Sequence, residues 1–122
     1  MIRIAVLVVC LALVSQAFAQ TMSDFAEANS NADAQAKSEA VLAYADAWAE
    51  FNNQNHLDER DGCYFKADGE LTQILEIDAS GKVVGYFADK DNGRSQCWRN
   101  TYLGVVFPKP PFAPYWHRLV MH

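Results

Sequence analysis

The sequence lacks the short motifs by which many enzymes are recognised. Its 122 residues contain no Cys-x-x-Cys, no His-x-x-x-His, no Gly-x-Ser-x-Gly and no glycine-rich phosphate loop. The three histidines, His56, His117 and His122, are too widely separated for the ligand spacing of a metal site. The acidic loop 89–93 does not continue to the glutamate that a calcium-binding loop requires. We therefore expect a protein with no enzymatic activity, no metal and no cofactor.

Basic residues are also scarce. The chain has 10 Lys and Arg against 15 Asp and Glu, which gives a net charge of −5. The cations are scattered, so the sequence has no basic patch of the kind that binds phosphate backbones, and we expect no nucleic-acid partner. No basic amphipathic helix suited to an anionic membrane surface is present either.

No apolar run is long enough to span a bilayer comfortably. The longest, residues 4–14, is shorter than the roughly 20 residues that a membrane helix needs. It follows the basic Arg3 and precedes Ala17 and Ala19, which are small residues at the positions that signal peptidase reads. This order predicts a signal peptide over residues 1–19 and a periplasmic or secreted protein without a stable membrane span after cleavage. Loss of Arg3 takes the net charge from −5 to −6.

Cysteine is rare as well. Of the three cysteines, Cys10 lies inside the predicted leader, and Val9 before it is a poor match to a lipid-attachment site. The mature chain keeps only Cys63 and Cys97. Two cysteines in an oxidising compartment predict one disulfide. A thiol active site that combines them with His117 is the less favoured alternative.

The N-terminal part of the mature chain divides into two segments. Residues 20–31 are polar and small, which predicts a flexible arm. Ser30 and Asp33 resemble a capping box that opens a helix. From residue 32 to about residue 54, apolar residues recur at helical spacing and predict an amphipathic helix, the first element of a single domain over residues 32–122.

The remaining pattern predicts an α+β fold. Residues 70–88 alternate between apolar and polar around an Asp-Ala-Ser-Gly turn, which indicates an antiparallel hairpin. A short helix is expected over residues 95–103, an extended proline-rich segment over 107–114 and a last strand over 115–121. The N-terminal helix and this β-β-α-β unit are expected to form a three-stranded antiparallel sheet with its helices on one face.

Several features of this unit occur in a fixed order. Gly69-Glu70-Leu71 opens a strand, the run from Leu75 to Val83 forms the hairpin, Cys97 lies on the next helix, and Phe107-Pro108-Lys109-Pro110 leads to the last strand. Together they resemble the C-terminal domain of TonB-type energy transducers, and more closely the disulfide-bearing TonB-like modules of bacterial envelope proteins. The resemblance covers about residues 63–122 and implies a periplasmic domain that binds another protein. The predicted cleavage of the leader and the absence of a long proline-rich spacer argue against the transducing role itself.

The resemblance also implies where a partner binds. In that family the final strand lies at a sheet edge and accepts an extended peptide as an added strand, which here corresponds to residues 115–120. Aromatic side chains crowd the same region, so we expect Phe112 with Tyr115 or Trp116 to stay partly exposed, although packing of all of them in the core is an equal alternative. The expected partner is an envelope protein or an extended peptide, and the predicted contact residues are Phe112, Tyr115, Trp116, Arg118 and Leu119.

A second hypothesis comes from size and charge alone. Short, acidic, secreted and disulfide-clasped proteins include periplasmic inhibitors and immunity proteins of envelope hydrolases, which block an active-site cleft with a loop. Here the blocking loop would be residues 89–94 or residues 107–114.

Overall fold

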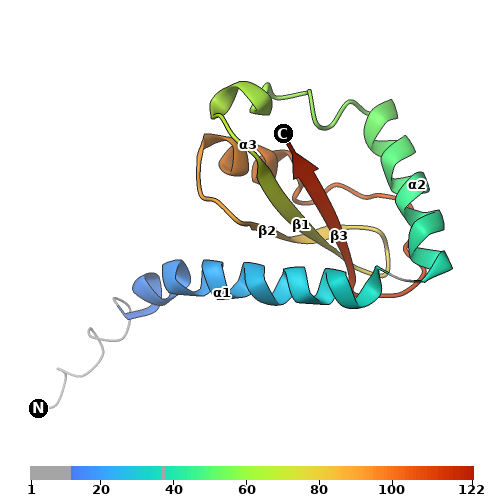
Figure 1. Cartoon of the computed structure of the whole chain (residues 1–122), viewed down its shortest axis with the longest axis horizontal. Helices are drawn as coiled ribbons and strands as arrows, with labels where there is room; N and C mark the ends of the chain where they lie inside the picture. The colour runs from blue at the N-terminus through green and yellow to red at the C-terminus, as the bar shows by residue number, and fades with distance from the viewer. Residues whose placement is uncertain (1–11, 37) are drawn as a thin grey trace, which may run out of the picture.

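The computed structural model describes residues 12–36 and 38–122, which form an α+β fold as predicted (Figure 1). Within these ranges no helix is long and apolar enough to cross a membrane. Residues 1–11 of the predicted signal peptide lie outside the described residues. In chain order the elements are α1 (Ala12–Gln35), α2 (Glu39–Gln54), the 3-10 helix η1 (Cys63–Lys66), β1 (Leu71–Ile77), β2 (Val83–Ala88), α3 (Gly93–Tyr102) and β3 (Tyr115–Met121).

The sheet has β1 at its centre, with the strand order β2-β1-β3 and both pairs antiparallel. The predicted hairpin is confirmed, and its turn is held by the Asp78 carboxylate, which accepts main-chain N–H bonds from Ser80 and Lys82. Gly81 has a φ of 95°, and a Cβ there would lie 2.0 Å from the carbonyl oxygen of Phe107. The last strand, β3, has the predicted bounds and lies at one edge of the sheet.

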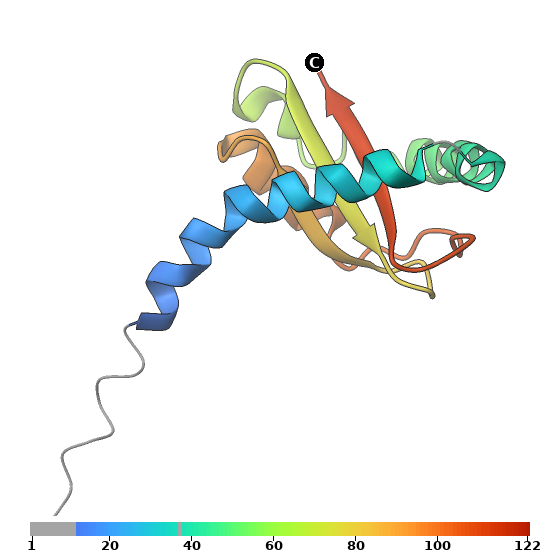
Figure 2. The ribbon, with the colours of Figure 1, turned by 60° about the horizontal axis from the view of Figure 1, so that its bottom comes forward.

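Helices cover both faces of this sheet, so the expected arrangement with all helices on one face is wrong. Leu71, Leu75 and Ile77 of β1 join the core beneath α2 and α3, whereas Ile74 points to the opposite face and packs against α1. Figure 2 shows α1 crossing the strands in front, with α3 behind them. The physical reason for a helix on the second face is Ile74, an apolar residue at a position of β1 where the alternation predicts a polar one. Its side chain would be exposed to water if this face were uncovered.

The prediction of a flexible arm over residues 20–31 is also wrong, because these residues lie within α1. Ala28 and Ala32 are buried against Ile74. Alanine favours the helix and lets α1 approach the sheet closely, yet its small side chain contributes little to an amphipathic pattern.

The expected helix over residues 32–54 is two helices in the structure. The first, α1, runs through Ser30, which therefore caps nothing, and ends at Gln35. The second, α2, begins after Ser38, whose Oγ accepts a hydrogen bond of 3.2 Å from the N–H of Val41. Serine is a favoured N-cap residue, and the serine that caps a helix here is Ser38, three residues beyond the end of α1.

Candidate functional site

Half of the main-chain groups of β3 face away from β1, because successive residues of a strand direct their N–H and C=O groups to alternate sides. The N–H of Trp116 donates to Oε1 of Gln35 over 2.9 Å and therefore faces outward. Arg118 and Val120, two and four residues further on, face the same way. Among residues 12–36 and 38–122, no hydrogen bond reaches the main-chain N–H or C=O of Arg118 or Val120. This stretch of the edge has unused hydrogen-bonding capacity.

The neighbouring part of the edge is occupied by Gln35, from the last turn of α1. Its Nε2 donates to the carbonyl oxygen of Pro114 over 3.1 Å, while its Oε1 accepts from Trp116. One carboxamide thus pairs with the C=O and the N–H that an adjacent strand would otherwise use. The unpaired edge is therefore limited to residues 118–120.

Two of the predicted contact residues point into the core. Tyr115 is 2% exposed, and its ring packs edge-on against Tyr44 with 4.7 Å between centroids. Leu119 is half-buried against the same core. Of the two alternatives for the residue exposed with Phe112, Tyr115 is buried and Trp116 is half-buried, because the two alternate along β3 and only Trp116 faces α1.

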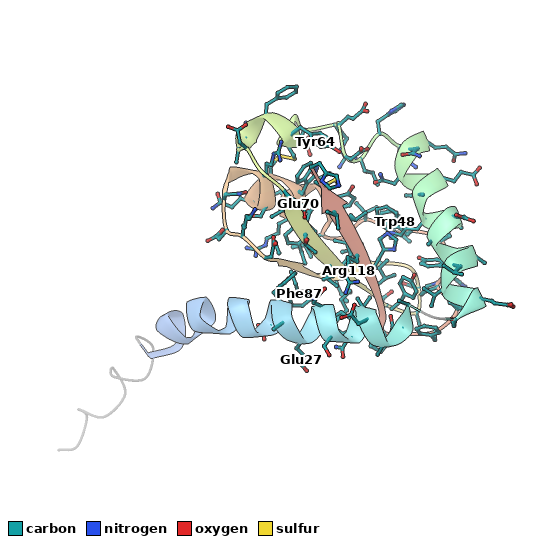
Figure 3. The ribbon with its side chains drawn as sticks, viewed as in Figure 1. Glu27, Trp48, Tyr64, Glu70, Phe87 and Arg118 are labelled. Carbon is teal, nitrogen blue, oxygen red and sulfur yellow. A yellow bond between two sulfur atoms is a disulfide. The ribbon has the colours of Figure 1, made fainter. Side chains whose placement is uncertain are left out.

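Arg118 is bound within the chain. Its Nε and Nη2 donate to Oδ1 of Asn29 over 3.0 and 2.6 Å, and Nη2 also lies 2.6 Å from Oδ1 of Asp33. Both partners belong to α1, and Figure 3 shows Arg118 near this helix. The side chain predicted to meet a partner is therefore engaged with α1, although the main-chain groups of the same residue are unpaired.

The other two predicted residues remain accessible. Trp116 is half-buried beside Phe87, with 5.9 Å between ring centroids. Phe112 is 39% exposed and lies 5.7 Å from the ring of Tyr115. Phe112 and Trp116 therefore satisfy the expectation of a partly exposed aromatic pair in the last third of the chain.

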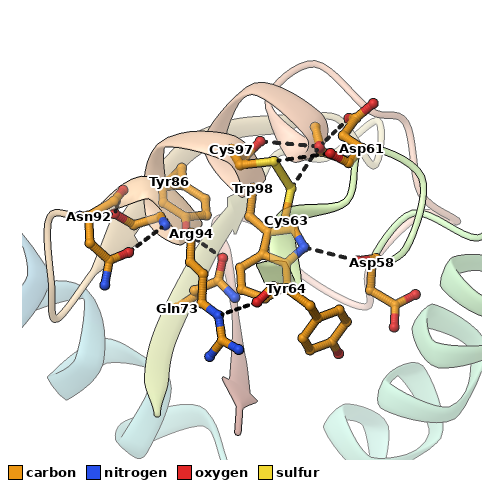
Figure 4. Close-up of a disulfide and its surroundings, with 12 residues drawn as sticks. Asp58, Asp61, Cys63, Tyr64, Gln73, Tyr86, Asn92, Arg94, Cys97 and Trp98 are labelled. Carbon is orange, nitrogen blue, oxygen red and sulfur yellow. Dashed lines mark hydrogen bonds between the residues drawn. A yellow bond between two sulfur atoms is a disulfide. The ribbon is translucent and has the colours of Figure 1, made fainter. Parts of the chain in front are cut away.

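The predicted disulfide between Cys63 and Cys97 is present, with 5.4 Å between the two Cα atoms (Figure 4). It joins η1 to α3. Arg94, one turn before Cys97, is buried and donates to the carbonyl oxygens of Tyr64 and Gly69. These contacts fix η1 and the start of β1 against α3, and β1 in turn holds β3 in register.

An aromatic stack supports β3 from the core side. The ring of Trp48 lies between those of His117 and Phe107, with centroid distances of 3.9 and 4.7 Å. Figure 3 shows Trp48 reaching from α2 toward β3. Desolvation by this burial lowers the pKa of His117 to about 3, so the imidazole is neutral at physiological pH.

A shallow groove lies between α1 and the sheet. Its walls carry the carboxylates of Asp24, Glu27 and Glu76, and Phe87 and Trp116 also line it. In the described part of the chain, none of the three carboxylates forms a salt bridge. The groove is therefore an acidic surface with aromatic rings.

The chemistry of the described residues is limited. Cys63 and Cys97 form a disulfide and offer no thiolate, and His117 is buried while His56 and His122 are exposed. Within the described ranges, no group of three or more His, Cys, Asp or Glu side chains is placed to hold a metal ion.

The sequence did not reveal the residues of α1 that contact β3: Asn29, Asp33 and Gln35. Two features of the sequence could have indicated this helix. Phe25, Ala28 and Ala32 have helical spacing, and Ile74 is an apolar residue on the otherwise polar face of β1.

Comparison with family models, with curated proteins and with solved structures finds no significant match. The resemblance to TonB-like modules therefore stays a prediction.

Proposed function

We propose that this chain is a periplasmic or secreted non-enzymatic module, exported by the leader 1–19, that binds an envelope protein by pairing with an extended segment at the outer edge of β3. The observation that carries the proposal is the unpaired main chain of Arg118 and Val120. An extended peptide satisfies such groups by strand addition, in which main-chain hydrogen bonds supply affinity. The TonB-like resemblance supports the same edge.

Two further features support this assignment. The disulfide, Arg94 and the stack around Trp48 hold the sheet rigid, so an incoming segment meets an edge that is already ordered. Val120 is 43% exposed, which leaves its side chain accessible beside the unpaired groups. Phe112 and Trp116 add apolar surface nearby.

The test uses proline at the edge. Val120→Pro removes the outward N–H, and no hydrogen bond to β1 is lost because this N–H faces away from it. Val120→Thr is the matched control, since it keeps the N–H and a β-branched side chain. The probe is a capped peptide of alternating threonine and valine, followed by amide NMR. We expect the peptide to shift the amide signal of Arg118 in the wild type and in Val120→Thr, but not in Val120→Pro, in which residue 120 has no amide N–H to donate.

Equal binding of the peptide to the proline variant, with melting temperatures matched, would show that the edge does not pair. Shifts confined to the groove at Asp24 and Glu76 would place the peptide elsewhere and contradict the proposal.

A second candidate function is inhibition of an envelope hydrolase by the loop 107–114, in which Phe107 is buried and the following residues are largely exposed. This loop is pinned at both ends, by a hydrogen bond of 2.6 Å from the Tyr44 hydroxyl to the carbonyl oxygen of Pro108 and by Gln35 at Pro114. A pinned loop that presents Phe112 suits insertion into a cleft. The alternative loop 89–94 is less suitable, because Arg94 is buried. Inhibition of lysozyme that is lost in Phe112→Ala and kept in Val120→Pro would favour this function.

A further inference from the structure

Gln35 forms the same contacts with β3 that one residue of an added strand would form. It accepts from the N–H of Trp116 over 2.9 Å and donates to the carbonyl oxygen of Pro114 over 3.1 Å. Gln35 ends α1, and the chain continues from it to Ser38 and α2. A segment that pairs with the whole of β3 therefore needs the position that Gln35 occupies.

A second attachment holds α1 at the next outward residue of β3. The Arg118 guanidinium is bound by Asp33 and by Asn29, which lie two and six residues before Gln35 on α1. The Arg118–Asp33 pair is partly exposed, with 32% and 66% of the two side chains accessible. Exposed pairs contribute little and weaken with salt, so this attachment is readily reversible.

Over residues 24–35 of α1, whose side chains the structure describes, the apolar contact with the sheet is small. Its buried members are Ala28, Ala32 and Ile74, and Phe25, Phe87 and Trp116 are only partly covered. The core on the other side of the sheet, in contrast, contains Trp48, Trp98, Tyr102 and many other large side chains. Since stabilisation by burial follows apolar area, this part of α1 loses little stabilisation on leaving the sheet.

We infer that α1 is an autoinhibitory latch, in which Gln35 imitates an added strand and restricts the binding edge to residues 118–120 until a partner displaces it. This inference rests on the proposed strand addition and describes how the same edge is regulated. Release of α1 extends the edge to Pro114 and uncovers Ile74 and Trp116, so binding and release favour each other.

The test removes the hydrogen bonds between Gln35 and β3 and keeps the rest of the fold. Gln35→Ala loses both hydrogen bonds, whereas Gln35→Glu keeps the acceptor for Trp116 and loses the donor to Pro114. The matched control is Glu27→Gln, an exposed position of α1 that makes no hydrogen bond to β3 within the described residues. Each variant is measured with the alternating threonine–valine peptide and by amide hydrogen exchange of the full domain.

We expect exchange of the Trp116 amide to rise about tenfold in Gln35→Ala, since a net hydrogen bond corresponds to a factor of roughly two to ten. Affinity for the peptide should also rise about tenfold in Gln35→Ala and less in Gln35→Glu, and Glu27→Gln should match the wild type. Asp33→Asn, which weakens the second attachment, should give a smaller gain.

The possible failures are distinct. If the wild type and Gln35→Ala bind the peptide equally well, the latch is refuted and the binding edge is retained. If neither binds it although the Trp116 amide has become exchangeable, strand addition itself is refuted, and the regulatory role of Gln35 with it.

Discussion

The burial of His117 predicts that mild acid destabilises this domain through a single side chain. In the folded state its pKa is about 3, lowered by desolvation, whereas an exposed histidine has a pKa of 6.5. Between these values the unfolded chain binds a proton that the folded chain does not. The free energy of unfolding therefore falls as the pH drops from 6.5 toward 3, by about 1.4 kcal/mol per pH unit.

The magnitude follows from the two pKa values. At pH 5 the expected loss from His117 alone is about 2 kcal/mol, and at pH 4 it is about 3 kcal/mol. Domains of this size are stable by only about 5–15 kcal/mol, so the loss is a large fraction of the total. Above pH 7 His117 is neutral in both the folded and the unfolded chain, so its titration no longer changes the free energy of unfolding.

The assay is urea unfolding between pH 4 and pH 8, followed by the fluorescence of tryptophan. His117→Phe keeps an aromatic ring beside Trp48 and cannot take up a proton, so its stability should depend less on pH by the amounts given above. His56→Asn is the matched control, because His56 is exposed and asparagine tolerates its φ of 51°. Parallel pH profiles for the wild type and His117→Phe would refute the reasoning.

Three further predictions concern stability. Replacing Cys63 and Cys97 with serine should lower the free energy of unfolding by about 4 kcal/mol, since the bridge closes a loop with a sequence separation of 34, and urea titration measures this. Gly81→Ala should lower the melting temperature far more than Gly104→Ala, because both glycines have positive φ but a Cβ meets atoms within 4 Å only at Gly81. Burial raises the pKa of Tyr44 to about 12, so the folded domain keeps this proton above pH 10 while the unfolded chain loses it. Stability should fall as the pH rises from 10 to 12, less steeply in Tyr44→Phe.

The sequence was sufficient for elements that depend on local chemistry. The turn at Asp78 and Gly81 predicts the hairpin because its residue types are specific to a tight turn, and two cysteines leave one pairing. The last strand was also found, since its β-forming residues follow a proline-rich segment.

The parts that were missed depend on contacts between distant segments. Gln35 and Trp116 are 81 residues apart in sequence, and no local pattern indicates that a glutamine amide will pair with a strand edge. Burial of Ala28 requires that the sheet expose Ile74 on its second face, which becomes visible only when both are considered together. Arg118 was placed on the correct strand, but its side chain was assigned to a partner because its contacts on α1 were unknown.

The central position of β1 has a consequence for how the molecule assembles. Its second neighbour in the sheet, β3, arrives in the chain only after β2, α3 and the proline-rich segment, and it also completes the stack around Trp48. A fragment that ends before Tyr115 lacks β3, and with it the partners Met121 and His117 that lie beside Leu71 and Leu75. The domain should therefore fold in one cooperative step of high contact order, after synthesis of residue 121, with no independently stable half.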